Sequence, residues 1–355
     1  MQDLLLDSAN NRLYVTDSEG QLHILDTTTL VEVATLPGSG ALVLDGEGGR
    51  LYASSGQTEE VVTVIDTASA EVVGIVSPGG QVTVDSSRGR FYVGNPIYGD
   101  PPEGAPGVRV YDAATFEKMG EIPQPGLPTY NPVRDEIVIV AYTAHLADPE
   151  TLRVTGDLLP EITAQPLAWC TGCTAVRSAH AFPERNLLML EMATLSAGKG
   201  PGRLPAPRFF DATTLAELTD WADLPGVEQA CEGRFILADP LDARVYRGAS
   251  YSRYVAHNNL LVYDLDGSLV TWRDGLALGV TNPNTKQMYA PRRNDVLVLD
   301  LATLLPVGTL PPVCIHTLDH ETGRIFGTKE GNLLVFSEEG DWLVPEPPVE
   351  GGPLP

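Results

Sequence analysis

The segment "GRFYVGN" at residues 89–95 is the strongest indication of the fold, because similar segments recur along the chain. It is a short apolar and aromatic run, and alone it would be an ordinary β-strand between turn residues. Its repetition instead indicates a structural unit that is built many times. The similar segments are "NRLYVTD" (11–17), "GRLYASS" (49–55), "ARVYRGA" (243–249), "KQMYAPR" (286–292) and "GRIFGTK" (323–329).

Each copy lies in a unit of four short strands. A short run such as "QVTVD" (81–85) precedes the aromatic strand, and a third apolar strand that ends in an acid follows it. A Thr-rich turn and a fourth strand such as "EVVGIVS" (71–77) complete the unit. The unit repeats after about forty residues, which is typical of a β-propeller blade. The acids that end the third strands are Asp26, Asp66, Asp112, Asp211, Asp264 and Asp300.

The sequence therefore predicts an all-β fold, a β-propeller of eight blades with four antiparallel strands each. Unit four is the least regular, with "EIVIVAYTA" (136–144) as its second strand and "LRVTGDLL" (152–159) as a weak third. Seven blades is the alternative, if unit four is an insertion or the chain ends share a blade. We expect a single propeller domain over 1–345 and a Pro/Gly-rich tail or linker over 346–355. The units span 3–38, 40–77, 80–123, 126–164, 173–223, 227–274, 277–311 and 313–345.

The segments "RLYVTDS" and "RFYVGNP", each with its "VxVxD…T" partner, resemble the YVTN-type β-propeller repeat of bacterial and archaeal surface proteins. The resemblance covers nearly the whole chain and implies the propeller fold. Members of such families serve as surface-layer, adhesion and binding proteins. Similar propellers form the heavy subunits of quinoprotein amine dehydrogenases, and others are lactonases or lyases. The resemblance carries no catalytic motif onto this chain, and a fold alone does not settle function.

The chain is strongly acidic, with 47 Asp and Glu against 23 Lys and Arg and a net charge of −24. Such a surface repels nucleic acid and anionic membranes, so we expect no nucleic-acid partner. No apolar run is long enough for a membrane span. The start "MQDLLLDS" shows no basic leader, so we expect a cytoplasmic protein or a mature or excised part of an exported one. An even number of cysteines favours an extracytoplasmic or cell-surface location.

The connection between the second and third strands differs in length from unit to unit. It is short in units one, seven and eight, and long in units three to six, at 95–107, 143–151, 193–207 and 247–259. Insertions that gather at one point of a repeat usually mark the binding face, although drift in tolerant loops is the alternative.

Arg, Lys, Tyr and His side chains gather in or beside these connections. Arg and Tyr are typical interface anchors, and basic groups on an acidic body attract carboxylate or phosphate. Solvated charges in local ion pairs are the alternative interpretation. The candidate binding residues are Tyr98, Tyr142, Lys199, Arg203, Arg208, Arg247, Tyr251, Arg253, Tyr254, His257, Arg292 and Arg293.

The four cysteines, Cys170, Cys173, Cys231 and Cys314, lie in blade connections or open a first strand. Disulfides are the first hypothesis, either Cys170 with Cys173 or Cys173 with Cys231. Four thiolates on zinc, and buried inert cysteines, are the alternatives. We expect no metal and no cofactor.

Three histidines, His180, His316 and His320, lie in or next to first strands. The sequence contains no phosphate loop, no G-x-S-x-G elbow and no H-E-x-x-H motif. The repeated acids are best explained as turn residues that accept backbone hydrogen bonds. We predict no catalytic residue.

These observations favour a non-catalytic recognition or scaffold propeller that binds a protein partner, or an anionic small molecule or glycan, on the face of the long connections. Two alternatives stay open. One is a redox- or metal-associated enzyme unit with a site at the channel mouth. The other is a structural component of a surface layer or filament.

Overall fold

The computed structural model describes residues 3–17, 19–38, 40–54, 61–95, 104–141, 143–160, 173–195, 208–218, 235–239, 244–250, 258–264, 269–274, 276, 279–282, 284–292, 295–319, 321–329, 332–341 and 343. Two compact units contain them. The first unit comprises residues 1–231 and 264–269, and the second comprises 232–263 and 270–355. The tail expected at 346–355 lies outside the described residues.

The described chain consists mainly of short strands with three one-turn 3-10 helices. The strands up to residue 231 are β1 Asp3–Asp7, β2 Arg12–Thr16, β3 Gln21–Asp26, β4 Glu32–Pro37, β5 Ala41–Asp45, β6 Arg50–Ser54, β7 Val62–Asp66, β8 Glu71–Val76, β9 Gln81–Asp85, β10 Arg90–Gly94, β11 Val108–Asp112, β12 Lys118–Ile122, β13 Leu127–Asn131, β14 Glu136–Ala141, β15 Thr143–Asp148, β16 Arg153–Asp157, β17 Cys173–Phe182, β18 Leu187–Leu195 and β19 Arg208–Asp211. The later strands are β20 Phe235–Asp239, β21 Arg244–Ser250, β22 Asn258–Asp264, β23 Leu269–Asp274, β24 Val280–Asn282, β25 Gln287–Pro291, β26 Val296–Asp300, β27 Pro306–Leu310, β28 Cys314–Asp319, β29 Arg324–Lys329 and β30 Asn332–Ser337. The 3-10 helices are η1 Ser8–Asn10, η2 Ser86–Arg88 and η3 Pro183–Arg185.

Within the described ranges these strands form eight antiparallel sheets, each built from strands that are consecutive in sequence. Six sheets have four strands, while β17–β19 and β28–β30 have three. At the fourth-strand position of the first of these lies a single bridge between Phe210 and Glu217. At the same position of the second, the Leu343 amide donates to the Val335 carbonyl at 2.9 Å. The prediction of an all-β chain of repeated antiparallel sheets is confirmed.

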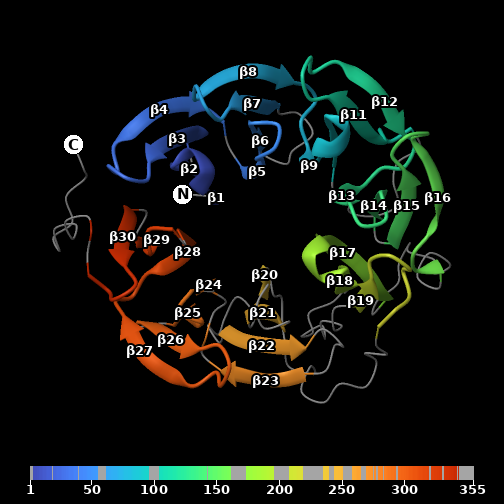
Figure 1. Ribbon diagram of the computed structural model, residues 1–355. Helices are drawn as coiled ribbons and strands as arrows, with labels where there is room; N and C mark the ends of the chain where they lie inside the picture. The colour runs from blue at the N-terminus through green and yellow to red at the C-terminus, as the bar shows by residue number, and fades with distance from the viewer. Residues whose placement is uncertain are drawn as a thin grey trace. The chain divides into compact units, whose positions relative to one another are not determined.

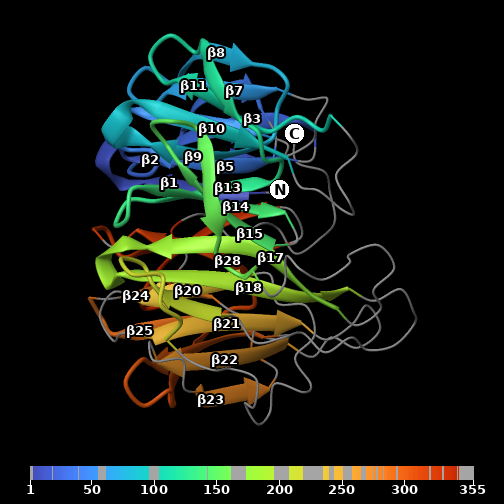
Figure 2. The same ribbon diagram turned by 90° about the vertical axis from the view of Figure 1, so that its right-hand side faces the viewer.

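Consecutive sheets of the first unit are in contact through their first strands, in the order β1, β5, β9, β13 and β17. Figure 1 shows these first strands on the inner side of the unit, and β4, β8, β12 and β16 on its outer side. Figure 2 shows β17 and β18 beside the sheet β13–β16, with which β17 is in contact. In the second unit, β24 contacts β28 in the same way. This stacking of sheets is that of a propeller-like repeat fold.

The hydrophobic core lies between consecutive sheets. Tyr52 of β6 packs with Phe91 of β10, and their ring centroids are 4.8 Å apart. Tyr92, the next residue, instead packs with Ile137 and Ile139 of β14. Successive side chains of a strand point to opposite faces, so the aromatic pair of the repeat buries both faces of its sheet. Phe91 and Tyr92 are both fully buried.

The residue before the second strand adopts a left-handed conformation in each described repeat where it is seen. It is Asn11 (φ 51°), Gly49 (φ 62°), Gly89 (φ 60°), Asp135 (φ 57°), Asn186 (φ 51°), Lys286 (φ 54°) or Gly323 (φ 66°). Gly, Asn and Asp tolerate this region best. The glycine or asparagine that opens most copies of the aromatic segment is therefore a requirement of the turn before it.

The prediction of a long connection at 143–151 in unit four is wrong. Strand β15 occupies Thr143–Asp148 and pairs with β14, from which residue 142 alone separates it. The expected third strand at 152–159 contains β16, which is the fourth strand of this sheet. The segment "TAHLAD" pairs because Ala144 and Leu146 face the core, as in the other third strands. A connection that we did not anticipate, 55–61, links β6 to β7.

No helix in the described part of the chain has the length and apolarity to span a bilayer.

Candidate functional site

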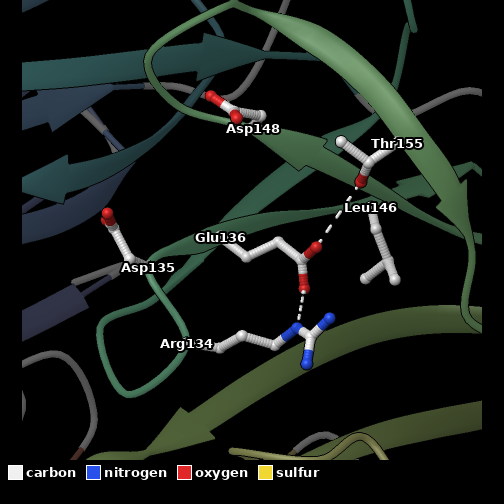
Figure 3. A pocket seen from close by; sticks show the side chains of 6 residues that line it. All are labelled: Arg134, Asp135, Glu136, Leu146, Asp148 and Thr155. Atoms are coloured by element: carbon white, nitrogen blue, oxygen red, sulfur yellow. Dashed lines mark hydrogen bonds and ion pairs between the residues drawn. The ribbon is translucent and has the colours of Figure 1, made fainter.

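A pocket opens on the sheet β13–β16, at the edge where tight turns join β13 to β14 and β15 to β16 (Figure 3). This edge is opposite to the one that carries the long connections between second and third strands. The cavity volume is about 540 Å³. Its lining residues are Arg134, Asp135, Glu136, Leu146, Asp148 and Thr155. Sequence reasoning proposed none of these residues.

Glu136 lies at the centre of the pocket, between Arg134 and Thr155 (Figure 3). It is the first residue of β14 and only 8% exposed. The Arg134 guanidinium donates through Nε to Glu136 Oε2 at 3.0 Å, while the Thr155 hydroxyl lies 3.5 Å from Oε1. Burial raises the pKa of Glu136, and the charge of Arg134 offsets this only in part. Oε1 therefore has acceptor capacity that its distant neighbour Thr155 satisfies poorly.

The other two carboxylates of the pocket are held in their charged forms. Two guanidinium nitrogens of Arg88 bond to Asp135, and this contact lowers the pKa of Asp135. Asp148 accepts the backbone amides of Thr151 at 2.8 Å and Glu150 at 2.7 Å, and these bonds lower the pKa of Asp148. Arg134 contributes the positive charge of the lining. Three carboxylates against one guanidinium leave the pocket with an excess of negative charge.

Arg88 of η2 connects the sheet β9–β12 to the sheet β13–β16 beside this pocket. Its guanidinium contacts Asp85 Oδ2 at 3.0 Å and Glu150 Oε1 at 2.5 Å, in addition to Asp135. The Asp85 side chain is fully buried. Ion pairs with Asp135, then Glu150 and Asp85, raise the pKa of Arg88. The cluster fixes the wall of the pocket that Asp135 forms.

A second polar cluster lies on the hairpin β17–β18. The Ser178 hydroxyl is 2.9 Å from His180 Nε2 and 3.0 Å from Glu191 Oε2. Ser178 pairs with Glu191 in the strand register, and Met189 and Phe209, on the same face, are fully buried. Ser178 donates to the Glu191 carboxylate, and because its hydroxyl has one proton, His180 Nε2 donates to Ser178. Burial lowers the pKa of His180, against the opposing charge of Glu191, so the imidazole is neutral near pH 7.

Most of the predicted binding residues cannot be placed. Arg247 belongs to β21, but its side chain is outside the described part of the chain. The predictions for these residues remain untested. Those that lie wholly outside the described residues are Tyr98, Tyr142, Lys199, Arg203, Tyr251, Arg253, Tyr254, His257 and Arg293.

The two described members of the predicted basic set form local ion pairs. Arg208 begins β19, and its Nε lies 2.6 Å from Glu217 Oε1, with the guanidinium 5.7 Å from the Phe210 ring centroid. Arg292 follows β25 and pairs with Asp295, three residues along the chain, at 2.6 Å through Nη2. Each arginine thus has an acidic neighbour in its own repeat, which agrees with the ion-pair interpretation.

Cys314 is the first residue of β28, as expected, whereas Cys173, which we expected in the connection before unit five, is the first residue of β17. Their side chains, and all of Cys170 and Cys231, lie outside the described residues. Disulfide, metal and free thiol thus remain open. Within the described ranges, no group of three or more His, Cys, Asp or Glu side chains is arranged to hold a metal ion. His320 is not described, whereas His316 Nε2 lies 2.8 Å from the Thr328 hydroxyl.

The interpretation of the repeated acids as turn residues is confirmed at five positions. Each accepts the backbone amide of the residue three positions later, at 2.7 to 2.9 Å. These bonds lower the pKa of the carboxyl groups, with the Thr303 side chain as the leading contributor at Asp300. Asp148 belongs to the same class, although unit four hid it from sequence reasoning. The confirmed acids are Asp26, Asp66, Asp112, Asp211 and Asp300.

A departure from the repeat marks the pocket in the sequence. The position of Glu136, at the start of the second strand, is Arg12 in β2, Arg50 in β6 and Arg90 in β10. The site predicted from the sequence was based on differences in connection length, so it did not include this inversion of charge.

The chain matches no known protein-family model. It also matches no curated protein. Among solved structures, it is similar to a computationally designed protein called Ika8, at 12% identity over 95% of each chain, with a TM-score of 0.58. It is similar as well to a eukaryotic initiation factor, at 9% identity over 97% of this chain and 86% of the other, with a TM-score of 0.57. At these identities the similarities concern the fold alone.

Proposed function

We propose that this protein is a non-catalytic recognition or scaffold module, built as an eight-bladed β-propeller of the YVTN type. The eight consecutive sheets, with first strands in contact from β1 to β17 in the first unit and between β24 and β28 in the second, support eight blades over seven. The ligand is a protein partner or an anionic small molecule or glycan, and the protein acts outside the cytoplasm or at the cell surface.

One observation carries this proposal: the repeat varies mainly at one edge of its sheets. The connections 55–61, 95–107, 196–207 and 251–257 all join a second strand to a third. At the opposite edge, tight turns closed by aspartates such as Asp26 and Asp112 recur from sheet to sheet. Loops carry function where a scaffold holds them in place, so the varied edge is the binding edge.

The test replaces residues 196–207, which include Lys199 and Arg203, with the short connection 17–20 of the first sheet. We expect the variant to melt within a few degrees of the wild type, because both ends of the graft are ordinary hairpin strands. Binding to an array of sulfated and carboxylated glycans and immobilised phosphorylated molecules should fall at least tenfold. The double substitution Lys199→Gln with Arg203→Gln separates loss of charge from loss of shape. Unchanged binding by both variants would place the ligand elsewhere on the protein.

An enzymatic role is the second candidate, and the Ser178, His180 and Glu191 cluster favours it. In the arrangement described above His180 Nε2 donates to Ser178, so acting as the base of an acyl transfer requires the other tautomer of His180 and release of Ser178 from Glu191. Mass spectrometry of the intact protein with and without reductant separates the candidates, since it reads cysteine pairing and bound metal together. Paired cysteines without metal would support the recognition module, and a metal that leaves on acidification would favour the enzyme.

A structural role is the third candidate. The outer strands of several sheets carry exposed apolar side chains, among them Val33 on β4, Ile75 on β8 and Val307 on β27. Assembly that grows with protein concentration in the absence of any ligand, followed by light scattering, would favour this role.

A further inference from the structure

The pocket around Glu136 lies where other repeats place an arginine. In the first sheet, the Arg12 guanidinium at the start of β2 pairs with Asp26 at the end of β3, with 3.0 Å between Nη1 and Oδ2. In the second sheet, Arg50 and Asp66 form the same pair across β6 and β7. The ion pair thus recurs in the first two sheets, where the guanidinium neutralises the aspartate that ends the third strand, while Arg90 of the third sheet instead donates to the Pro149 carbonyl at 2.9 Å.

In the sheet β13–β16 this pair is inverted in charge. The register that sets Ile137 opposite Ala147 places Glu136 across from Asp148. Two carboxylates therefore stand where the repeat has a carboxylate and a guanidinium, and the charge of Asp148 contributes to the raised pKa of Glu136. Arg134 binds the far oxygen of Glu136 and also donates to the Thr213 carbonyl at 3.0 Å. Its guanidinium is held away from Asp148.

We propose that this pocket binds an alkylguanidinium group, either of a small molecule or of an arginine side chain from a partner, which takes the place of the repeat's own arginine. The site is at the edge opposite to the long connections and does not depend on the proposed function. Glu136 Oε1 and Asp148 accept the guanidinium protons, and Thr155 lies at the side of the cavity. Leu146 supplies the apolar surface along which the alkyl stem lies.

The size and charge of the cavity agree with this ligand. A volume of about 540 Å³ is within the usual range of small-molecule pockets. The planar, delocalised guanidinium matches carboxylate pairs by bidentate bonding and is more weakly hydrated than an ammonium group. Among the described residues, the three carboxylates of the lining do not form a group arranged to hold a metal ion.

The test is calorimetric titration of the full chain with n-butylguanidinium and, as its neutral isostere, n-butylurea. We expect the guanidinium to bind and the urea to bind at least tenfold more weakly. Glu136→Gln should lower the guanidinium affinity at least tenfold. Glu117→Gln is the control, because it removes one exposed negative charge that belongs neither to the lining nor to the Arg88 cluster, and it should change the affinity less than twofold. Equal binding of urea, an equal loss in both variants or no binding of the guanidinium would overturn the proposal.

A second variant keeps the test decisive if Glu136→Gln folds poorly. Glu136→Arg restores the arginine of the repeat opposite Asp148, so it should fold at least as well as the wild type and bind no guanidinium. Binding as tight as in the wild type would overturn the proposal. Titrating an arginine-containing tripeptide against free n-butylguanidinium then distinguishes a partner side chain from a small molecule, since a tripeptide that binds more tightly points to the partner.

The pH dependence of the affinity for n-butylguanidinium identifies which carboxylate of the pocket binds the guanidinium. The guanidinium stays charged throughout, and the pKa values of Asp135 and Asp148 are lowered, whereas that of Glu136 is raised. Affinity should therefore fall as the pH drops through a midpoint above the ordinary pKa of a glutamate. A midpoint below pH 4 would point to the aspartates and overturn the assignment to Glu136.

Discussion

Phe91 and Tyr92 show at the scale of single residues why the repeat has its form. The two aromatic rings point to opposite faces of β10, so one strand joins two neighbouring cores. Each fully buried ring of this kind contributes about 1.5 to 3 kcal/mol. Gly89, the residue before the strand, adopts a left-handed conformation that ends the one-turn helix η2, and β10 begins directly after it.

Gly89→Ala should lower the free energy of unfolding by about 1 kcal/mol. The cause is its φ of +60°, because an added Cβ would meet nothing within 4 Å. The matched control is Gly156→Ala on the edge strand β16, where there is equally open space and no positive φ. It should be neutral or slightly stabilising. Urea denaturation measures both, and equal effects at the two positions would contradict the strain argument.

At the scale of elements, polar side chains near the turns join each sheet to the next. Asn10 donates to the Thr67 hydroxyl at 3.3 Å, and Asn131 donates to the Ala212 carbonyl at 3.0 Å. Arg88 is the most heavily bonded of these links, with three carboxylates around one guanidinium. Burial determines how much the Arg88 ion pairs stabilise the fold, because losing a partly buried charge pair costs more free energy than losing an exposed one.

Arg88→Met should destabilise the protein by about 3 kcal/mol, since it leaves the buried Asp85 carboxylate without its charge partner. Lys118→Met is the control, because Lys118 pairs with Glu121 at 2.6 Å but both side chains are well exposed. It should cost less than about 1 kcal/mol. Thermal melting of both variants gives the comparison. A similar melting temperature for the two would show that the Arg88 cluster adds little to stability.

At the scale of the whole molecule, the turn aspartates and the net charge of −24 set the response to pH. The folded-state pKa values of Asp26, Asp66 and Asp112 are lowered by their turn hydrogen bonds. A carboxyl group whose pKa is depressed in the folded state stabilises the fold at pH values above its unfolded-state pKa. This stabilisation is lost as the pH falls through the folded-state pKa. Because the turn recurs, these contributions are lost together.

We therefore expect the melting temperature to fall steeply below about pH 4, near the ordinary pKa of aspartate. Added salt should raise the melting temperature at pH 7, because it screens the repulsion among excess carboxylates. Asp112→Asn, which keeps the acceptor oxygen and removes the titration, should reduce the steepness of the acid transition. Scanning calorimetry across pH and salt checks these outcomes. A flat profile between pH 5 and 3 would contradict the role of the turn acids.

The candidate site was only partly accessible from the sequence. The inversion from Arg12, Arg50 and Arg90 to Glu136 is visible in the aligned repeats. Its consequence is not, because a glutamate at a strand end is usually solvated. The tertiary structure leaves this carboxylate only 8% exposed and places it beside a cavity that residues of β13–β16 and their turns line. For Arg208 and Arg292, the sequence did not reveal the nearby Glu217 and Asp295 as partners.

The all-β class, the repeating unit and the turn acids could be predicted from the amino-acid sequence alone. The alternation of apolar and polar residues, the turn residues and the length of the repeat are local patterns, so they can be recognised without knowledge of tertiary contacts. The tertiary structure alone decided the strand register of unit four, the links between sheets and the pocket at Glu136. These depend on which face of a strand meets the next sheet. Side chains that are distant in sequence come together there, and burial then sets both the charge state of a carboxylate and the cost of leaving it without a partner.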